Sequence, residues 1–142
     1  MYYVQYAHAR SCNVDRNAAA AGITYDGADV GLLDTVADGE VLAALAQWPA
    51  LLREAGDLRA PHRVAHYRKD LAATDHKWYN VERVVPMART DPEARGEDAE
   101  AGRIAKAPEP ARAAARLKLN DAVRTVIAEG LDLLGVTAPD RM

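Results

Sequence analysis

The sequence has one cysteine, no phenylalanine and no long apolar run. Cys12 alone cannot form an internal disulfide bond, so nothing requires an oxidising compartment. A bilayer-spanning helix needs roughly 18–20 apolar residues in succession, and no segment has them. The first apolar stretch contains Gln5, His8 and Arg10, which is unlike a signal peptide. These absences predict a cytoplasmic protein with no membrane partner.

Patterns typical of catalytic sites are also missing. The chain has no glycine-rich phosphate loop, no Ser/His/Asp signature and no paired cysteines. His62 and His66 lie one helical turn apart and could be two ligands of a metal, but only Asp70 on the same segment could complete the site. We therefore interpret both histidines as polar helix surface. We expect no catalytic residue, no metal and no cofactor in this chain.

Charge is distributed unevenly along the chain. The formal net charge of −3 argues against a nonspecific nucleic-acid binder held by bulk electrostatics. Residues 23–56 contain six acidic residues and one base, whereas residues 59–83 contain six Lys or Arg, three acids and three histidines. A local basic face on an acidic domain is compatible with a site-specific RNA contact.

The pattern of apolar residues is typical of helices, and 142 residues suffice for one domain with one core. No segment shows sustained strand alternation, so we predict an all-α bundle in which the first, the 61–85 and the last helices pack together. The expected elements are a helix over 2–21 that ends at Gly22, a loop over 23–37, a helix containing 41–46, a short helix from Pro49, a long helix from Pro61 to about Val85, and a last helix with an apolar stripe over 119–134.

Residues 86–110 contain four prolines, several charges and few apolar residues. Such a composition does not supply enough apolar surface to pack against a core. We predict that this segment is a mobile linker inside a single domain that spans 1–142.

Aromatic residues provide the most informative local pattern. Tyr3 and Tyr6 lie three apart on the first helix, and Tyr79 is followed by Asn80 and Arg83. Exposed rings beside Arg and Asn can stack on bases while their neighbours contact phosphates and base edges. The alternative is that these rings belong to the core, as we expect for Tyr67 and Trp78 on the apolar stripe.

Several segments together resemble the C-terminal domain of arginyl-tRNA synthetases. The stretch Tyr-Val-Gln-Tyr-Ala-His-Ala-Arg at 3–10 looks like the signature that opens this domain. Asp121–Arg124 matches the Asp-Ala-Leu-Arg motif for which the fold is named, with Val in place of Leu. The resemblance continues in order through 48–49, 61–67, 71–72, 79–80, 115–117, 130–136 and 139–142.

The resemblance implies the anticodon-binding helical bundle of class I aminoacyl-tRNA synthetases. Its partners would be tRNA(Arg) and the catalytic domain of the same polypeptide. That domain would bind ATP with Mg and form the arginine–tRNA ligase, whereas this fragment alone would be non-catalytic. The positions matching family anticodon contacts are Tyr3 or Tyr6, Tyr79 and Met142; the chemistry of their neighbours adds Asn80, Arg83 and Arg141.

We interpret Asp121 and Arg124 as stabilising the structure instead of binding a ligand, because residues at i and i+3 on a helix can form an ion pair. The alternative function is a free-standing helical module that binds a protein partner and no RNA. The start Met1-Tyr2-Tyr3 offers no Ser, Thr or Asp helix cap, which favours a domain cut from a longer chain over that alternative.

Overall fold

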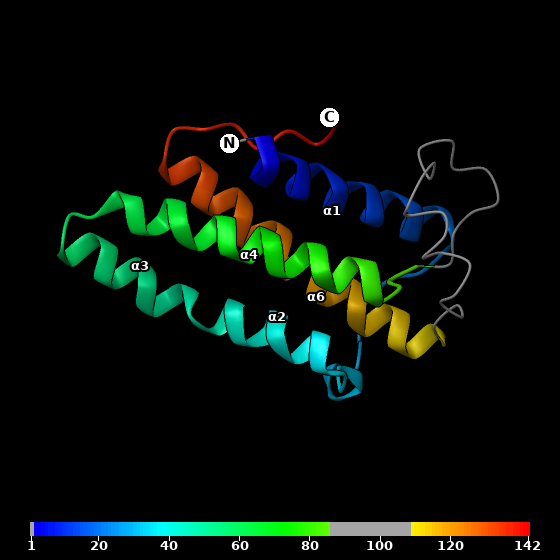
Figure 1. Cartoon of the computed structure of the whole chain (residues 1–142). Helices are drawn as coiled ribbons and strands as arrows, with labels where there is room; N and C mark the ends of the chain where they lie inside the picture. Colours follow the sequence, from blue (N-terminus) through cyan, green and yellow to red (C-terminus); the bar gives the residue numbers. More distant parts are fainter. Residues whose placement is uncertain (1, 86–108) are drawn as a thin grey trace.

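The computed structural model describes residues 2–85 and 109–142, which form a helical bundle with no strand in this part of the chain. Figure 1 shows the arrangement of its elements. In chain order these are α1 (Tyr2–Ala20), the 3-10 helix η1 (Val30–Leu32), α2 (Val36–Ala46), α3 (Trp48–Asp57), α4 (Pro61–Val81) and α6 (Pro110–Leu133). The all-α prediction is confirmed.

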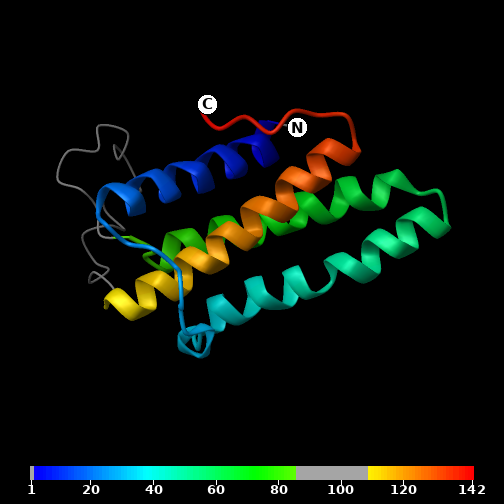
Figure 2. The same ribbon diagram turned by 180° about the vertical axis from the view of Figure 1, so that it is seen from behind.

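The central element is α4, which packs against α1, α2, α3 and α6. In Figures 1 and 2, α1 lies on one side of the α4–α6 pair, and α2 and α3 follow each other along the other side. Trp78, Leu71, Val123, Ile127 and Leu131 have almost no exposed surface. The predicted packing of the first helix, the helix starting at Pro61 and the last helix is therefore confirmed, as is the core position of Tyr67 and Trp78.

Local sequence accounts for several helix ends. Gly22 has a φ of +70°, and the amide of Ile23 donates to the carbonyl of Ala18 at 2.9 Å, which closes α1 as predicted. Thr35 and Asp38 form a capping box that starts α2 at Val36, inside the segment predicted to be a loop. The sequence pattern placed the start of α2 too far along the chain, because the glycines and aspartates before Thr35 are typical of a loop.

Two other predicted boundaries were wrong. The helix from Pro61 ends at Val81 instead of Val85, since Glu82 is extended and Val84 is buried. The last helix begins at Pro110, a good first-turn residue, so Glu109 and Pro110 do not belong to a linker. The rest of the predicted linker, 86–108, lies outside the described residues. Among the described helices, none is both long and apolar enough to span a membrane.

Asp38 on α2 is the most deeply buried ionisable residue among the described residues, and its carboxyl group lies between α2, α4 and α6. Its Oδ1 accepts a hydrogen bond from Nε1 of Trp78 at 2.8 Å, and its Oδ2 accepts one from the amide of Thr35 at 3.3 Å. Nε of Arg116 on α6 lies 3.9 Å from Oδ1. A buried polar group is costly unless it is paired, so these contacts fix α2 against α4 and α6.

We predict that Trp78→Phe lowers the free energy of unfolding by about 1–3 kcal/mol beyond the loss of ring volume, because the buried carboxyl of Asp38 loses a donor. Urea unfolding followed by circular dichroism measures the change. Trp48→Phe is the matched control: Nε1 of Trp48 donates to Glu129 at 3.0 Å, and the exposed Glu129 can bind water instead. Equal losses in the two variants would contradict this role of Asp38.

Candidate nucleic-acid interface

Arg10 on α1 organises the contact between α1 and the second half of α4. Its Nη1 donates to Nδ1 of His76 at 2.8 Å, and its Nη2 pairs with the carboxyl of Asp75. The guanidinium carbon lies 4.5 Å from the centre of the Tyr79 ring, which is a cation–π distance. One planar cation therefore sets the positions of three α4 side chains.

Asp75 is the buried partner in this group. Its side chain is only 2% exposed, and burial raises the pKa of its carboxyl, although the neighbouring Arg10 opposes that rise. In the sequence, the polar residues Thr74 and Asp75 interrupt the apolar positions of this helix. The structure shows that Asp75 points inward and that Arg10 compensates its burial.

Tyr3 extends the same group on α1. Its ring lies edge-on to His76 with 6.4 Å between ring centres, and its hydroxyl is 3.5 Å from the carbonyl oxygen of Ala72. The side-chain nitrogen of the exposed Asn80 lies 3.4 Å from Nε2 of His76. His76 and Arg10 therefore bring together three predicted contact residues, Tyr3, Tyr79 and Asn80. The predicted site did not include His76 or Arg10. The signal for Arg10 was its place at the end of the 3–10 signature.

The segment that follows α6 turns back along another side of α1, as Figures 1 and 2 show. Gln5 donates to the carbonyl of Thr137 at 3.0 Å, and Arg16 donates to that of Asp140 at 3.2 Å. Arg141 and Met142 follow this contact, and both are exposed. The structure thus places the backbone immediately before these two predicted residues beside α1.

Tyr6 lies between these two groups. Helical spacing puts it on the side of α1 between Tyr3 and Arg10, which face α4, and Gln5, which holds the last segment. Its side chain is 49% exposed, so the ring is open to solvent. We call the group of Tyr3, Tyr6, Tyr79 and Asn80 the tyrosine face, whereas Arg141 and Met142 follow the contact of the last segment with Gln5 and Arg16.

Arg83 does not belong to the helices that carry the tyrosine face. It lies beyond the end of α4 and is half-buried, and its carbonyl accepts a hydrogen bond from Nη1 of Arg116 at 3.0 Å. The position of the Arg83 side chain relative to Tyr79 therefore does not follow from helical spacing. Its contact with phosphate stays a prediction.

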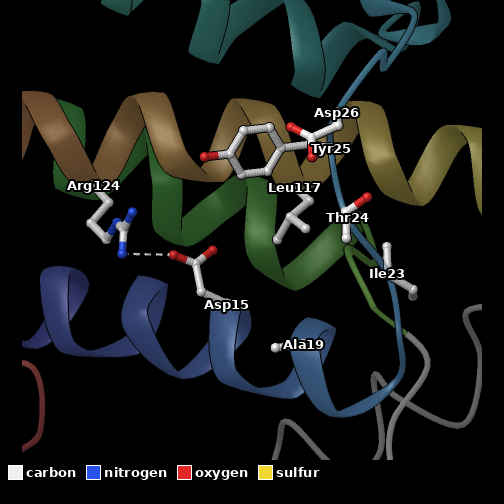
Figure 3. A pocket seen from close by; sticks show the side chains of 8 residues that line it. All are labelled: Asp15, Ala19, Ile23, Thr24, Tyr25, Asp26, Leu117 and Arg124. Carbon is white, nitrogen blue, oxygen red and sulfur yellow. Dashed lines mark ion pairs between the residues drawn. The ribbon is translucent and has the colours of Figure 1, made fainter.

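A different hollow, of about 320 Å³, lies between α1, α6 and the loop after α1 (Figure 3). Arg124 in its wall pairs with Asp15 at 2.8 Å and also with Asp121, which agrees with the structural interpretation of the Asp121–Arg124 pair. Burial raises the pKa of Asp15 despite the pairing. With Asp26 also in its wall and its arginine already paired, the hollow does not suit a phosphate.

Histidine and cysteine side chains meet at one other place. The ligand atoms of His8, Cys12 and Asp140 all lie within 4.8 Å of one another. Nδ1 of His8 is 2.9 Å from the carbonyl oxygen of Pro139, and only a protonated nitrogen can donate there, so this nitrogen offers no lone pair to a cation. Burial raises the pKa of the Cys12 thiol. We interpret the three as packing between α1 and the last segment.

We predict that Arg10→Met lowers the free energy of unfolding by about 3–5 kcal/mol, because it leaves the buried Asp75 carboxyl without its cation. The double variant Arg10→Met/Asp75→Leu should recover most of that loss. Urea unfolding measures both. A double variant as unstable as Arg10→Met would show that the unpaired carboxyl is not the cause.

The same variant should have a distinctive pH dependence. Without Arg10 the pKa of Asp75 rises further above its unfolded value, so the folded state holds the proton more tightly. Stability relative to the parent is then greatest below the ordinary aspartate pKa and falls as pH rises through the folded value. Unfolding at pH 4 and pH 7 tests this, and a deficit that is independent of pH would contradict it.

Comparison with known proteins agrees with this arrangement. A family model described as the DALR anticodon binding domain matches residues 4–142. Proteins named arginine–tRNA ligase are similar over the whole chain: one from Bifidobacterium adolescentis is 90% identical, one from Bifidobacterium animalis subsp. lactis 76%, and one from Kineococcus radiotolerans 47%. The chain spans 24%, 24% and 23% of the length of these relatives. The chain belongs to the DALR anticodon-binding domain family.

Proposed function

We propose that this chain binds the anticodon stem-loop of tRNA(Arg) and so supports ATP-dependent arginylation in protein synthesis. The observation that carries the proposal is the tyrosine face, where exposed rings lie on a helix whose orientation is set by the Arg10 contacts. The similarity to arginine–tRNA ligases along the whole chain supports arginine as the amino acid. The partners are tRNA(Arg) and a catalytic domain of the same polypeptide, which binds ATP with Mg, in the cytoplasm.

Recognition in this proposal uses stacking, hydrogen bonds and charge. The exposed Tyr3 and Tyr6 offer ring faces to unstacked anticodon bases, and the half-buried Tyr79, with Arg10 over one side of its ring, offers the other side. The amide of Asn80 reads a base edge. Arg83 and Arg141 neutralise phosphates, and Met142 packs on a base. Since the domain has a net charge of −3, these local cations and rings provide the specificity that bulk charge does not.

A free-standing module that binds a protein partner is the alternative. Its exposed rings would pack on an apolar surface and would be indifferent to RNA. Similarity to arginine–tRNA ligases supports the RNA-binding proposal instead, and the alternative would be favoured if the parent chain captured no stem-loop.

We expect Tyr79→Ala to weaken binding of an anticodon stem-loop by about 1–3 kcal/mol, the contribution of one base–aromatic stack, whereas Tyr79→Phe retains most binding. Fluorescence anisotropy with a labelled stem-loop measures both. Tyr25→Ala is the control, because Tyr25 is a partly accessible tyrosine that borders the hollow of Figure 3. Equal binding by all three variants and the parent would remove Tyr79 from the site.

Arg83→Ala should weaken binding to stem-loops of different sequence alike and lower the salt slope by about one, as loss of a phosphate contact does. The measurement is the stem-loop dissociation constant over a series of salt concentrations. In a full-length arginine–tRNA ligase with this domain, the same variant should raise the tRNA concentration needed for half-maximal arginylation. An unchanged salt slope would exclude a phosphate contact by Arg83.

We also expect the purified chain to show no arginine-dependent ATP–pyrophosphate exchange, because its sequence contains no nucleotide-binding motif. Reproducible exchange that requires arginine would overturn the assignment of chemistry to another domain.

A further inference from the structure

Three side chains of α1 bind the main chain of the last segment. Gln5 donates to the carbonyl of Thr137, His8 to that of Pro139, and Arg16 to that of Asp140, with distances of 3.0, 2.9 and 3.2 Å. The spacing along α1 follows the order of the segment, so helix and segment run side by side in the same direction. We call these three contacts the carbonyl clamp. Because it binds carbonyl oxygens, the clamp fixes the path of the backbone instead of selecting side chains.

His8 is the central and most buried member of the clamp. The carbonyl of Pro139 can only accept, which puts the proton of the ring on Nδ1. The Cys12 thiol lies 3.8 Å from the same nitrogen and donates to Oδ1 of Asp140 at 3.7 Å. Water has little access here, since His8 and Cys12 are both buried, so an unmade bond would not be replaced by solvent.

The clamp ends immediately before Arg141 and Met142. Both side chains are exposed, and Met142 remains 60% exposed although its neighbours are held against α1. A ligand that covers the exposed Met142 removes apolar surface from water, which favours binding. A backbone that is already held in place loses less conformational entropy when the ligand binds. The tyrosines of α1 lie on the adjacent side of the same helix.

We propose that Gln5, His8 and Arg16 are positioning residues for RNA: they hold 137–140 against α1 and so order the backbone that carries the exposed Arg141 and Met142 before RNA arrives. This inference rests on the proposed function. Ordering the segment in the free protein removes an entropy cost from binding. His8 itself does not contact RNA, because it is buried beneath the segment.

The first arm of the test uses the 142-residue chain without RNA. Methionine labelled with ¹³C at the methyl group reports the order of Met142, and Met142→Ala identifies the signal. His8→Phe should give Met142 the narrow line and random-coil shift of a mobile side chain. His8→Asn, whose amide nitrogen can take the place of Nδ1, should preserve the parent signal. If His8→Phe does not fold, Gln5→Met with Arg16→Met removes two clamp donors from the less buried sites.

The second arm measures stem-loop affinity in a double-mutant cycle. His8→Phe should weaken binding on the order of five- to tenfold, the equilibrium equivalent of about one buried hydrogen bond. In the background Arg141→Ala/Met142→Ala the same change should have almost no effect, since the residues it positions are gone. A role in fold stability alone would weaken binding equally in both backgrounds.

Each outcome decides the inference. An unchanged Met142 signal in the clamp variants overturns the clamp, and a mobile Met142 with unchanged affinity overturns its role in RNA binding. Equal loss of affinity in both backgrounds assigns His8 to fold stability. If the parent chain binds no stem-loop and Tyr79→Ala changes nothing, the proposed function fails; the first arm still reports on the clamp, so the two failures are distinguishable.

Discussion

The buried carboxyl group of Asp38 is the constraint on which the bundle depends. It lies at the first turn of α2, accepts from Trp78 on α4 and faces Arg116 on α6. A polar group with no exposed surface tolerates few arrangements of its donors, whereas apolar side chains can pack in several. The hydrophobic residues supply most of the stability, and Asp38 selects the relative positions of the three helices.

Trp78 connects this buried contact to the tyrosine face. Its indole is fixed by Asp38, and Tyr79, the next residue on α4, points toward Arg10 on α1. A shift of α4 against α2 would therefore also displace Tyr79. The proposed RNA-binding face is thus built on packed helices, with the ion pair of Arg10 and Asp75 holding α1 against α4.

Sequence patterns identified most helices but misplaced their ends where a tertiary contact competes with local preference. Residues 82–85 continue a helical spacing, yet the chain leaves the helix so that Val84 can be buried and Arg116 can bind Glu82 and the carbonyl of Arg83. Of the predicted contact residues, Tyr3, Tyr79 and Asn80 gather in one place because neighbouring positions on α1 and α4 face each other. Arg83 does not follow this spacing because α4 has already ended.

The sequence by itself determined the helical class, the single core and the similarity of the 3–10 and 121–124 motifs to one family, because periodicity and motif order are local properties. Tertiary structure alone decided which side chains meet. Arg10 finds Asp75 65 positions away, and His8 finds the carbonyl of Pro139 131 positions away. Periodicity shows which residues share a side of one helix, but the partner of a charged or polar side chain depends on how two helices pack, and that follows from the core as a whole.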